Sequence, residues 1–221
     1  YQLHEESLDP DSNNVNVYNN WAQTYDNYVD SLDYMGPKNI VENLIKLLEN
    51  KDKYLKILDF GCGTGKVGEE LKNKLNSSYY LEGIDISPNM LKNAEKKNVY
   101  NELNNIDLTK EIYNKKFDII LSSGVFLEGH VNINNISRLQ KLLNKHGILL
   151  FTIRETFKDS NSEDFYKYVL SNKNFISYSM IDIEYLKNVK CKLVIMRTWI
   201  IFIFKIIFFL LLFFYKIKII I

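Results

Sequence analysis

The stretch LDFGCGTGKVG, residues 58–68, follows a short apolar run and places glycines at positions 61, 63 and 65. Glycine adopts the positive φ angles of tight turns easily, and its missing side chain lets a ligand approach the backbone. Any one of these glycines could belong to an ordinary turn. Three of them at alternate positions directly after a strand, however, predict a ligand-binding loop at the end of that strand.

Strand-like and helix-like segments alternate on both sides of this loop. Strands are expected at 54–60, 79–85, 117–123 and 148–153, and amphipathic helices at 18–29, 37–48, 67–75, 87–94 and 133–143. Units of this length predict an α/β fold, a doubly wound and mostly parallel sheet with helices on both faces. The segment CKLVIMRTW, residues 191–199, is expected to complete the sheet with antiparallel strands at its edge.

Length and charge limit the classes of function. A chain of 221 residues fits one domain with a sizeable core. Its 28 basic and 27 acidic residues give a net charge of +1, which supplies no field for gripping a phosphate backbone. Binding to nucleic acid is therefore not expected.

The cysteines and the amino-terminal sequence bear on the compartment. Cys62 and Cys191 lie far apart, and a disulfide at Cys62 would obstruct the glycine loop, so both are expected as free thiols. The sequence starts at Tyr1 and shows no basic-then-apolar leader, so no secretory signal is expected. Both features favour a cytoplasmic protein.

Composition changes abruptly in the segment 199–221, which is apolar or aromatic apart from three lysines. Its longest uninterrupted apolar run, between Lys205 and Lys216, is shorter than the ~20 residues that span a bilayer. A membrane anchor therefore requires Lys205 to snorkel. The alternative to a membrane anchor is that the first part of the segment is a buried final strand and the remainder is aberrant sequence. The domain is accordingly drawn over 1–198, with membrane association through 199–221 left open.

One nucleotide-binding pattern is excluded by its spacing. The phosphate loop of nucleoside triphosphatases has four residues between its first glycine and Gly-Lys, and Ser or Thr follows the lysine. Here three residues separate Gly61 from Gly65, and Val67 follows Lys66.

Two further patterns overlap in the same loop. The segment 63–68, GTGKVG, fits the dinucleotide pattern, and Asp85 stands about 20 residues on as a ribose partner. That interpretation leaves Asp59 and Gly61 without a purpose. The pattern Asp-x-Gly-x-Gly-x-Gly over 59–65 uses every one of these residues.

LDFGCGTG followed by GIDISPNML resembles the S-adenosylmethionine-dependent methyltransferases of the Rossmann-like class. WAQTYDNYVDSLDYMGP, SSGVFLEGHVN and HGILLFTIRE are similar to the group that includes the methyltransferase-like protein of the Williams-Beuren syndrome region. The resemblance covers residues 14–170. It implies a Rossmann-like fold, S-adenosylmethionine as cofactor and a small-molecule methyl acceptor.

The resemblance also implies roles for individual residues. An acid and the loop backbone would hold the methionyl part of the cofactor, namely Asp59, Gly61, Cys62, Gly63 and Gly65. Asp85 would accept both ribose hydroxyls, Ile86 would pack on the adenine, and Asp107 would face the adenine amino group.

Two further binding candidates come from other segments. Tyr25, with Trp21 and Tyr28, lies on the opening helix, which covers the cofactor in similar proteins; aromatic faces also favour a sulfonium charge. Trp21 could equally be a core residue of that helix. Ser122, at the end of the strand 117–123, completes the set.

The chemistry needs few catalytic side chains, because a sulfonium methyl is already a strong electrophile. The protein chiefly aligns an acceptor atom about 3 Å from the methyl and excludes water. His130 could remove a proton from an attacking hydroxyl or amine, or it could anchor its loop. Arg154 could bind an acidic substrate or pair with a nearby carboxylate.

Methyl transfer is the function that the whole pattern favours. SSGVF stands where the amide- and adenine-methylating branches carry an Asn/Asp-Pro-Pro-aromatic element, so resemblance to those branches is absent. An NAD-linked oxidoreductase is the alternative enzyme, resting on 63–68 and Asp85. A non-catalytic cofactor-binding module is the third possibility.

Overall fold

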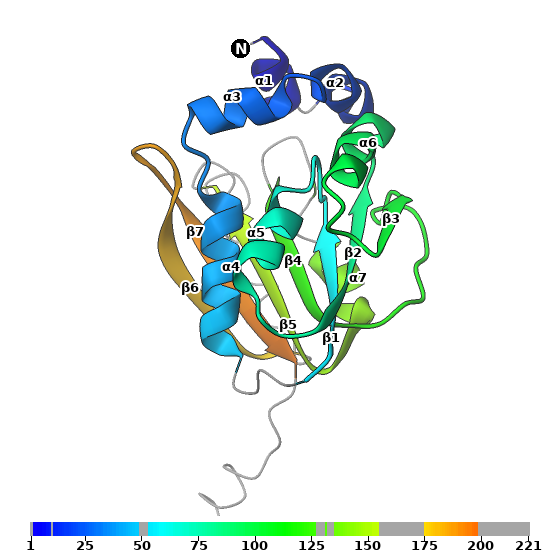
Figure 1. Ribbon diagram of the computed structural model, residues 1–221, viewed down its shortest axis with the longest axis vertical. Helices are drawn as coiled ribbons and strands as arrows, with labels where there is room; N and C mark the ends of the chain where they lie inside the picture. Colours follow the sequence, from blue (N-terminus) through cyan, green and yellow to red (C-terminus); the bar gives the residue numbers. More distant parts are fainter. Residues whose placement is uncertain are drawn as a thin grey trace, which may run out of the picture.

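The apolar run before the glycine loop forms a central strand of one sheet in the computed structural model, which describes residues 2–9, 11–48, 53–126, 131, 135–154 and 175–198. Within these residues the strand order is β3-β2-β1-β4-β5-β7-β6 (Figure 1). The strands are β1 (Leu55–Phe60), β2 (Tyr79–Asp85), β3 (Glu102–Asn105), β4 (Phe117–Phe126), β5 (Leu143–Ile153), β6 (Phe175–Leu186) and β7 (Val189–Thr198). Neighbours among β1 to β5 pair in parallel, and β7 is antiparallel to both β5 and β6.

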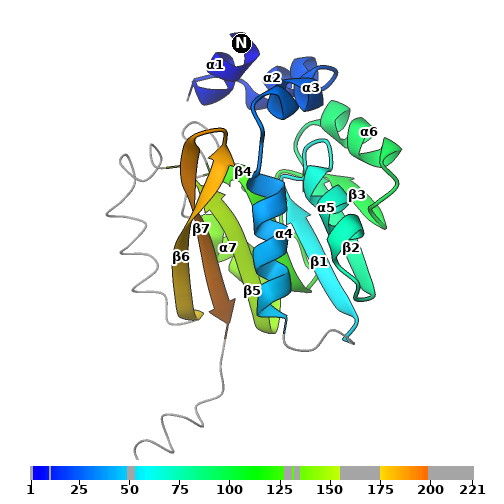
Figure 2. The ribbon, with the colours of Figure 1, turned by 60° about the vertical axis from the view of Figure 1, so that its left-hand side comes forward.

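Helices cover both faces of this sheet. They are α1 (Gln2–Leu8), α2 (Asn14–Trp21), α3 (Tyr25–Ser31), α4 (Gly36–Leu47), α5 (Lys66–Lys74), α6 (Pro88–Lys96) and α7 (Ile136–Leu142). Figure 2 shows α4 and α5 in front of the sheet and α7 behind it. The expectation of a doubly wound, mostly parallel fold is confirmed.

The double covering follows from the residues of β1. Ile57 packs with the apolar stripes of α4 and α5, whereas Leu58 packs with the stripe of α7 on the opposite face. Both side chains are fully buried. Since burying such a side chain stabilises the fold by ~1.5–3 kcal/mol, a strand that is apolar on both faces needs a helix layer on each side.

The helix expected over 18–29 is instead two helices, α2 and α3, and this part of the sequence prediction is wrong. The break falls at residues 22–24. The carbonyl oxygen of Ala22 accepts a hydrogen bond of 2.6 Å from Asn93 Nδ2 of α6. Asp26, in the first turn of α3, accepts a 2.5 Å hydrogen bond from Thr64 of the glycine loop. These hydrogen bonds to distant segments stabilise the break between α2 and α3. The prediction was wrong because apolar periodicity within one segment carries no information about such bonds.

The closing strands agree with the expectation from CKLVIMRTW, since β7 and β6 extend the sheet beyond β5. His130 and the segment 199–221 lie outside the described residues. None of the helices in the described part of the chain is both long and apolar enough to cross a bilayer.

Candidate functional site

A cavity of about 530 Å³ lies at the carboxyl ends of the parallel strands, where β1, β2 and β4 meet residues of α2 and α3. In Figure 1 the helices α1 to α3 form a layer across this end of the sheet. Six of the residues predicted for the cofactor line the cavity: Tyr25, Gly61, Gly63, Asp85, Ile86 and Asp107. The other four do not line it: Asp59, Cys62, Gly65 and Ser122.

The glycine loop runs from the end of β1 to the start of α5 and is tied to β2. Gly61 N and Cys62 N donate to Ile84 O at 2.8 and 3.0 Å, and Gly65 N donates to Cys62 O at 2.8 Å. The φ angles of Gly61, Gly63 and Gly65 are +68°, +53° and +90°. All three lie in the left-handed region, which L side chains rarely adopt.

The three glycines nevertheless have different surroundings. A Cβ at Gly61 would lie 2.2 Å from Val125 Cγ2, and one at Gly65 would lie 3.0 Å from the Tyr100 ring. A Cβ at Gly63 would meet no atom within 4 Å. Gly61 and Gly65 are therefore required by packing, whereas Gly63 keeps the wall of the cavity open.

Asp85 stands at the end of β2 and faces the same cavity. Its Oδ2 accepts from Gly63 N and its Oδ1 accepts from Ser87 N, each at 2.8 Å. Burial raises the pKa of this carboxyl group, and the hydrogen bonds from Ser87 and Gly63 oppose that rise. Each carboxylate oxygen can accept a second hydrogen bond, so Asp85 retains capacity for a ligand hydroxyl.

Asp59 is fully buried beneath the loop. Its Oδ2 accepts a 2.6 Å hydrogen bond from the Tyr100 hydroxyl, and its Oδ1 has no hydrogen-bond partner among the described residues. Burial raises the pKa of Asp59 to about 7; the Tyr100 bond lowers it and the nearby Asp85 charge raises it further. Asp59 is thus a carboxyl group with one unused oxygen that titrates near neutral pH.

Asp107 also lines the cavity, in the loop that follows β3. Its Oδ1 accepts from the backbone N of Thr109 at 2.9 Å, and its Oδ2 pairs with Lys110 Nζ at 2.9 Å. Partial burial opposes ionisation, but the bonds from Thr109 and Lys110 are stronger together and lower the pKa of Asp107. The side chain is therefore an anion that its own loop holds in place.

Two further candidates, Cys62 and Ser122, are buried and do not line the cavity. Burial raises the pKa of the Cys62 thiol well above its ordinary value, with contributions from Asp85 and Asp59, so this cysteine is a packing residue. Ser122 is buried, and its hydroxyl has no partner among the described residues; its neighbour Ser123 lines the cavity instead.

Polar bonds hold α2 and α3 over the cavity. Asn19 Oδ1 accepts from Ser87 Oγ at 2.7 Å, at the start of α6. Asp26 pairs with Lys97 at 3.0 Å. These contacts place Tyr18 and Tyr25 against the cavity, whereas Trp21 is 5% exposed and packs with Ala22 and Met90.

Sequence reasoning missed several residues of this site. Tyr18 and Met90 line the cavity, and Tyr100 is the partner of Asp59. Tyr18 belongs to the apolar stripe of the helix expected over 18–29, but the stripe does not indicate which of its residues face a ligand. No local signal joins Tyr100 to Asp59, because the two are 41 residues apart.

Solved structures share this fold at low sequence identity. The plantazolicin methyltransferase BpumL, in complex with S-adenosylhomocysteine (SAH), matches with a TM-score of 0.58 and 16% identity, over 90% of this chain and 100% of that one. A putative S-adenosylmethionine-dependent methyltransferase from Methanococcus maripaludis matches with a TM-score of 0.57 and 17% identity, over 85% and 95% of the two chains.

Sequence relatives are closer. Methyltransferase-like protein 27 of Homo sapiens is 32% identical over 143 residues, which are 63% of this chain and 57% of that protein. Malonyl-[acyl-carrier protein] O-methyltransferase 2 of Ilyobacter polytropus is 30% identical over 168 residues, which are 71% of this chain and 61% of the relative. The chain thus spans less than two thirds of each of these relatives.

A family defined as a methyltransferase domain matches residues 51–187, which include the glycine loop, Asp85, Asp107 and most of the sheet. This match covers more than half of the chain, and it agrees with the resemblance that the glycine loop and the segment after β2 indicated. The chain therefore belongs to the methyltransferase domain family.

Proposed function

We propose that this domain transfers a methyl group from S-adenosylmethionine to a small-molecule acceptor. The observation that carries the proposal is the open space beside Gly63, where a Cβ would meet no neighbouring atom within 4 Å, together with the Asp85 carboxylate in the lining of the same cavity. Family membership supports the reaction type. The cavity of about 530 Å³ is within the usual range for a small-molecule site.

The proposed cofactor contacts follow the walls of the cavity. The Gly61–Gly63 backbone and Asp59 would hold the methionyl part, and Asp85 would accept the ribose hydroxyls. Ile86 would pack on the adenine, Asp107 would face its amino group, and Tyr25 would cover the cofactor from α3. Asp59 is fully buried and does not line the cavity, so its charge would act on the cofactor's ammonium group from beneath the loop and not by direct contact.

In the reaction, a lone pair on the acceptor atom forms a bond to the methyl carbon as the carbon–sulfur bond breaks. The sulfonium becomes the neutral thioether SAH, and any proton on the acceptor atom leaves to a base or to water. The protein's part is alignment and exclusion of water, which α2 and α3 provide by covering the cavity. His130 as the base stays a proposal, with anchoring of its loop as the alternative.

Calorimetric titration with SAH and with NAD tests this function directly. We expect micromolar or tighter binding of SAH and no binding of NAD. Turnover with radiolabelled S-adenosylmethionine then separates an enzyme from a non-catalytic binding module. Binding of NAD in place of SAH would favour the oxidoreductase that the 63–68 pattern also allows.

We expect SAH affinity to depend on pH through Asp59. Only the ionised carboxylate attracts the cofactor's ammonium group, so below the Asp59 pKa of about 7 the acid must release a proton on binding. Affinity should rise by up to about tenfold per pH unit below that value and level off above it. Titrations at pH 5.5 to 8.5 measure this, together with proton release in buffers of different ionisation enthalpy.

Asp59→Asn provides the matched control, because it cannot titrate and should flatten the profile. The same pKa shift predicts that the free protein loses stability as pH rises from 3.8 to about 7, since the folded state holds the proton more tightly than the unfolded chain. A pH-independent affinity in the original protein would show that Asp59 does not contribute to cofactor binding.

We also propose that the domain ends near residue 198 and is cytoplasmic, as the free Cys62 and Cys191 thiols favour. Truncation after Phe204 should leave SAH affinity unchanged, because every proposed ligand precedes that point. It should also improve solubility, since the removed run is larger than ordinary exposed apolar patches. Lost affinity in a folded truncated protein would place the tail against the cofactor domain.

A further inference from the structure

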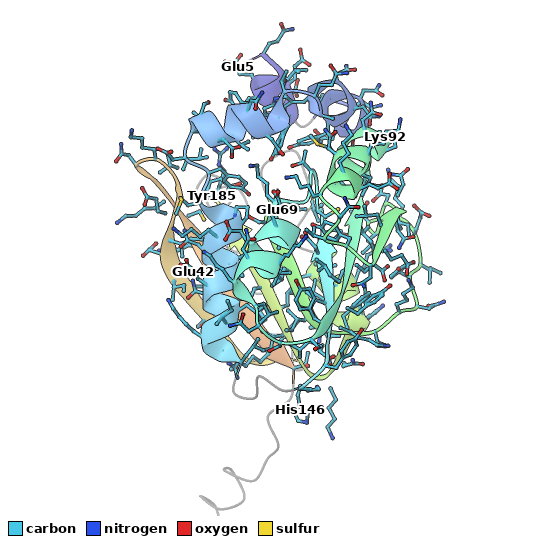
Figure 3. All side chains as sticks on the ribbon, viewed as in Figure 1. Glu5, Glu42, Glu69, Lys92, His146 and Tyr185 are labelled. Atoms are coloured by element: carbon cyan, nitrogen blue, oxygen red, sulfur yellow. The ribbon has the colours of Figure 1, made fainter. Side chains whose placement is uncertain are left out.

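A second, smaller pocket adjoins the cofactor cavity beneath α1 to α3. Its volume is about 50 Å³, and it shares Tyr18, Tyr25 and Gly124 with the larger cavity. Six of the residues that line it are aromatic: Tyr18, Trp21, Tyr25, Tyr28, Tyr34 and Tyr185. Figure 3 labels Tyr185 between α3 and α4, near the loop that carries Tyr34.

The rings are fixed by contact with one another. Trp21 and Tyr25 meet edge to face with centroids 5.1 Å apart, and Tyr34 and Tyr185 do the same at 5.0 Å. The Tyr34 hydroxyl is further bonded to Ser123 Oγ at 2.8 Å. The wall is therefore mostly apolar, so a charge inside it is less screened than a charge in open water.

Arg154 supplies that charge. It follows β5 directly, and its guanidinium carbon lies 5.7 Å from the centre of the Tyr185 ring. No carboxylate of the described residues lies within ion-pair distance of Arg154, and the pocket lining contains no acid. The sequence allowed two roles for Arg154, binding an acidic substrate or pairing with a carboxylate of the protein. The described residues provide no carboxylate for the second role.

The other titratable base of the lining adds no positive charge at neutral pH. Burial, and then the charge of Arg154, lower the pKa of His4 below its ordinary value. Among the described residues that line the pocket, Arg154 therefore supplies the positive charge. A planar guanidinium that has no carboxylate partner among the described residues matches the two oxygens of a ligand carboxylate.

We propose that this pocket binds a carboxylate of the methyl acceptor, and that Arg154 recognises it. The inference rests on the proposed function and names the acceptor as a small acid. A volume of about 50 Å³ is far below that of an ordinary small-molecule site, so the pocket admits the carboxylate end and not the whole acceptor. The rest of the acceptor extends past Gly124 into the larger cavity, where its nucleophilic atom meets the methyl group.

The test uses the full chain saturated with SAH and two probes of the same shape, phenylacetate and phenylacetamide, followed by ligand-detected NMR. We expect phenylacetate to bind about tenfold more tightly than the amide, the usual scale for a hydrogen bond to a charged group. Arg154→Gln should remove this difference, and Arg154→Lys should keep part of it. Arg197→Gln is the matched control, because Arg197 lies on β7 and lines neither pocket.

The comparison of the two probes in the unmodified protein needs no variant, so it stands even if Arg154→Gln loses stability. SAH affinity is measured in the same samples. Absence of SAH binding would overturn the proposed function itself. Intact SAH binding with equal affinity for both probes, or with neither bound, would overturn the carboxylate subsite alone.

Discussion

Gly63→Leu is expected to abolish SAH binding while the domain stays folded, with affinity reduced at least about a hundredfold, or ~2.7 kcal/mol. The reason is the unusual surroundings of this glycine. A Cβ there meets no protein atom within 4 Å, and the residue lines the cavity. The new side chain would therefore occupy ligand space without displacing the protein. Calorimetric titration of the variant measures the effect.

The control for this variant is its stability. The φ of Gly63 is +53°, so any L side chain adds strain of ~1–2 kcal/mol, which denaturant unfolding measures. Gly61→Ala gives the contrast, because its Cβ would lie 2.2 Å from Val125 Cγ2 and should lower the free energy of unfolding instead. Full SAH affinity in folded Gly63→Leu would refute the assignment of the cavity to the cofactor.

Asp85→Ala is the second large effect, an expected loss of roughly 1.5–3 kcal/mol in SAH binding, the usual size for hydrogen bonds to a charged group. Asp85 ends β2, faces the cavity and has acceptor positions beyond those used by Gly63 N and Ser87 N. Those positions would accept the ribose hydroxyls. The measurement is the dissociation constant of SAH for the two proteins.

Because Asp85 also holds the loop, the loss must be separated into ligand and loop contributions. An SAH analogue without both ribose hydroxyls should bind the original protein weakly, and any further loss in Asp85→Ala then measures the contribution of the loop. Asp107→Ala is the comparison within the same cavity, and it should have a smaller effect, because Thr109 and Lys110 already engage the Asp107 carboxylate. Preserved SAH affinity in Asp85→Ala would mean that another group holds the ribose.

The local pattern of the sequence was sufficient for β1, β2 and the glycine loop, whereas β3, which precedes Asp107, was not among the expected strands. The expected strand 79–85 is β2 itself, and the run 54–60 contains β1. Ser87 caps α6 through a 3.2 Å bond from Met90 N, and Pro88 begins that helix, close to the expected start at 87. Such features depend on neighbours along the chain, namely apolar periodicity, capping and glycine in tight turns.

The sequence by itself therefore determined the fold class, the position of the loop and the acid at the end of β2, because these depend on the order of residues within successive strand–loop–helix units. Only the tertiary structure decided which glycine faces open space, where the opening helix breaks and that Tyr100 reaches Asp59. It also placed Arg154 among aromatic rings from α2, α3 and β6. These features depend on side chains that meet from distant segments, and their contacts, burial and electrostatics exist only once the sheet has formed.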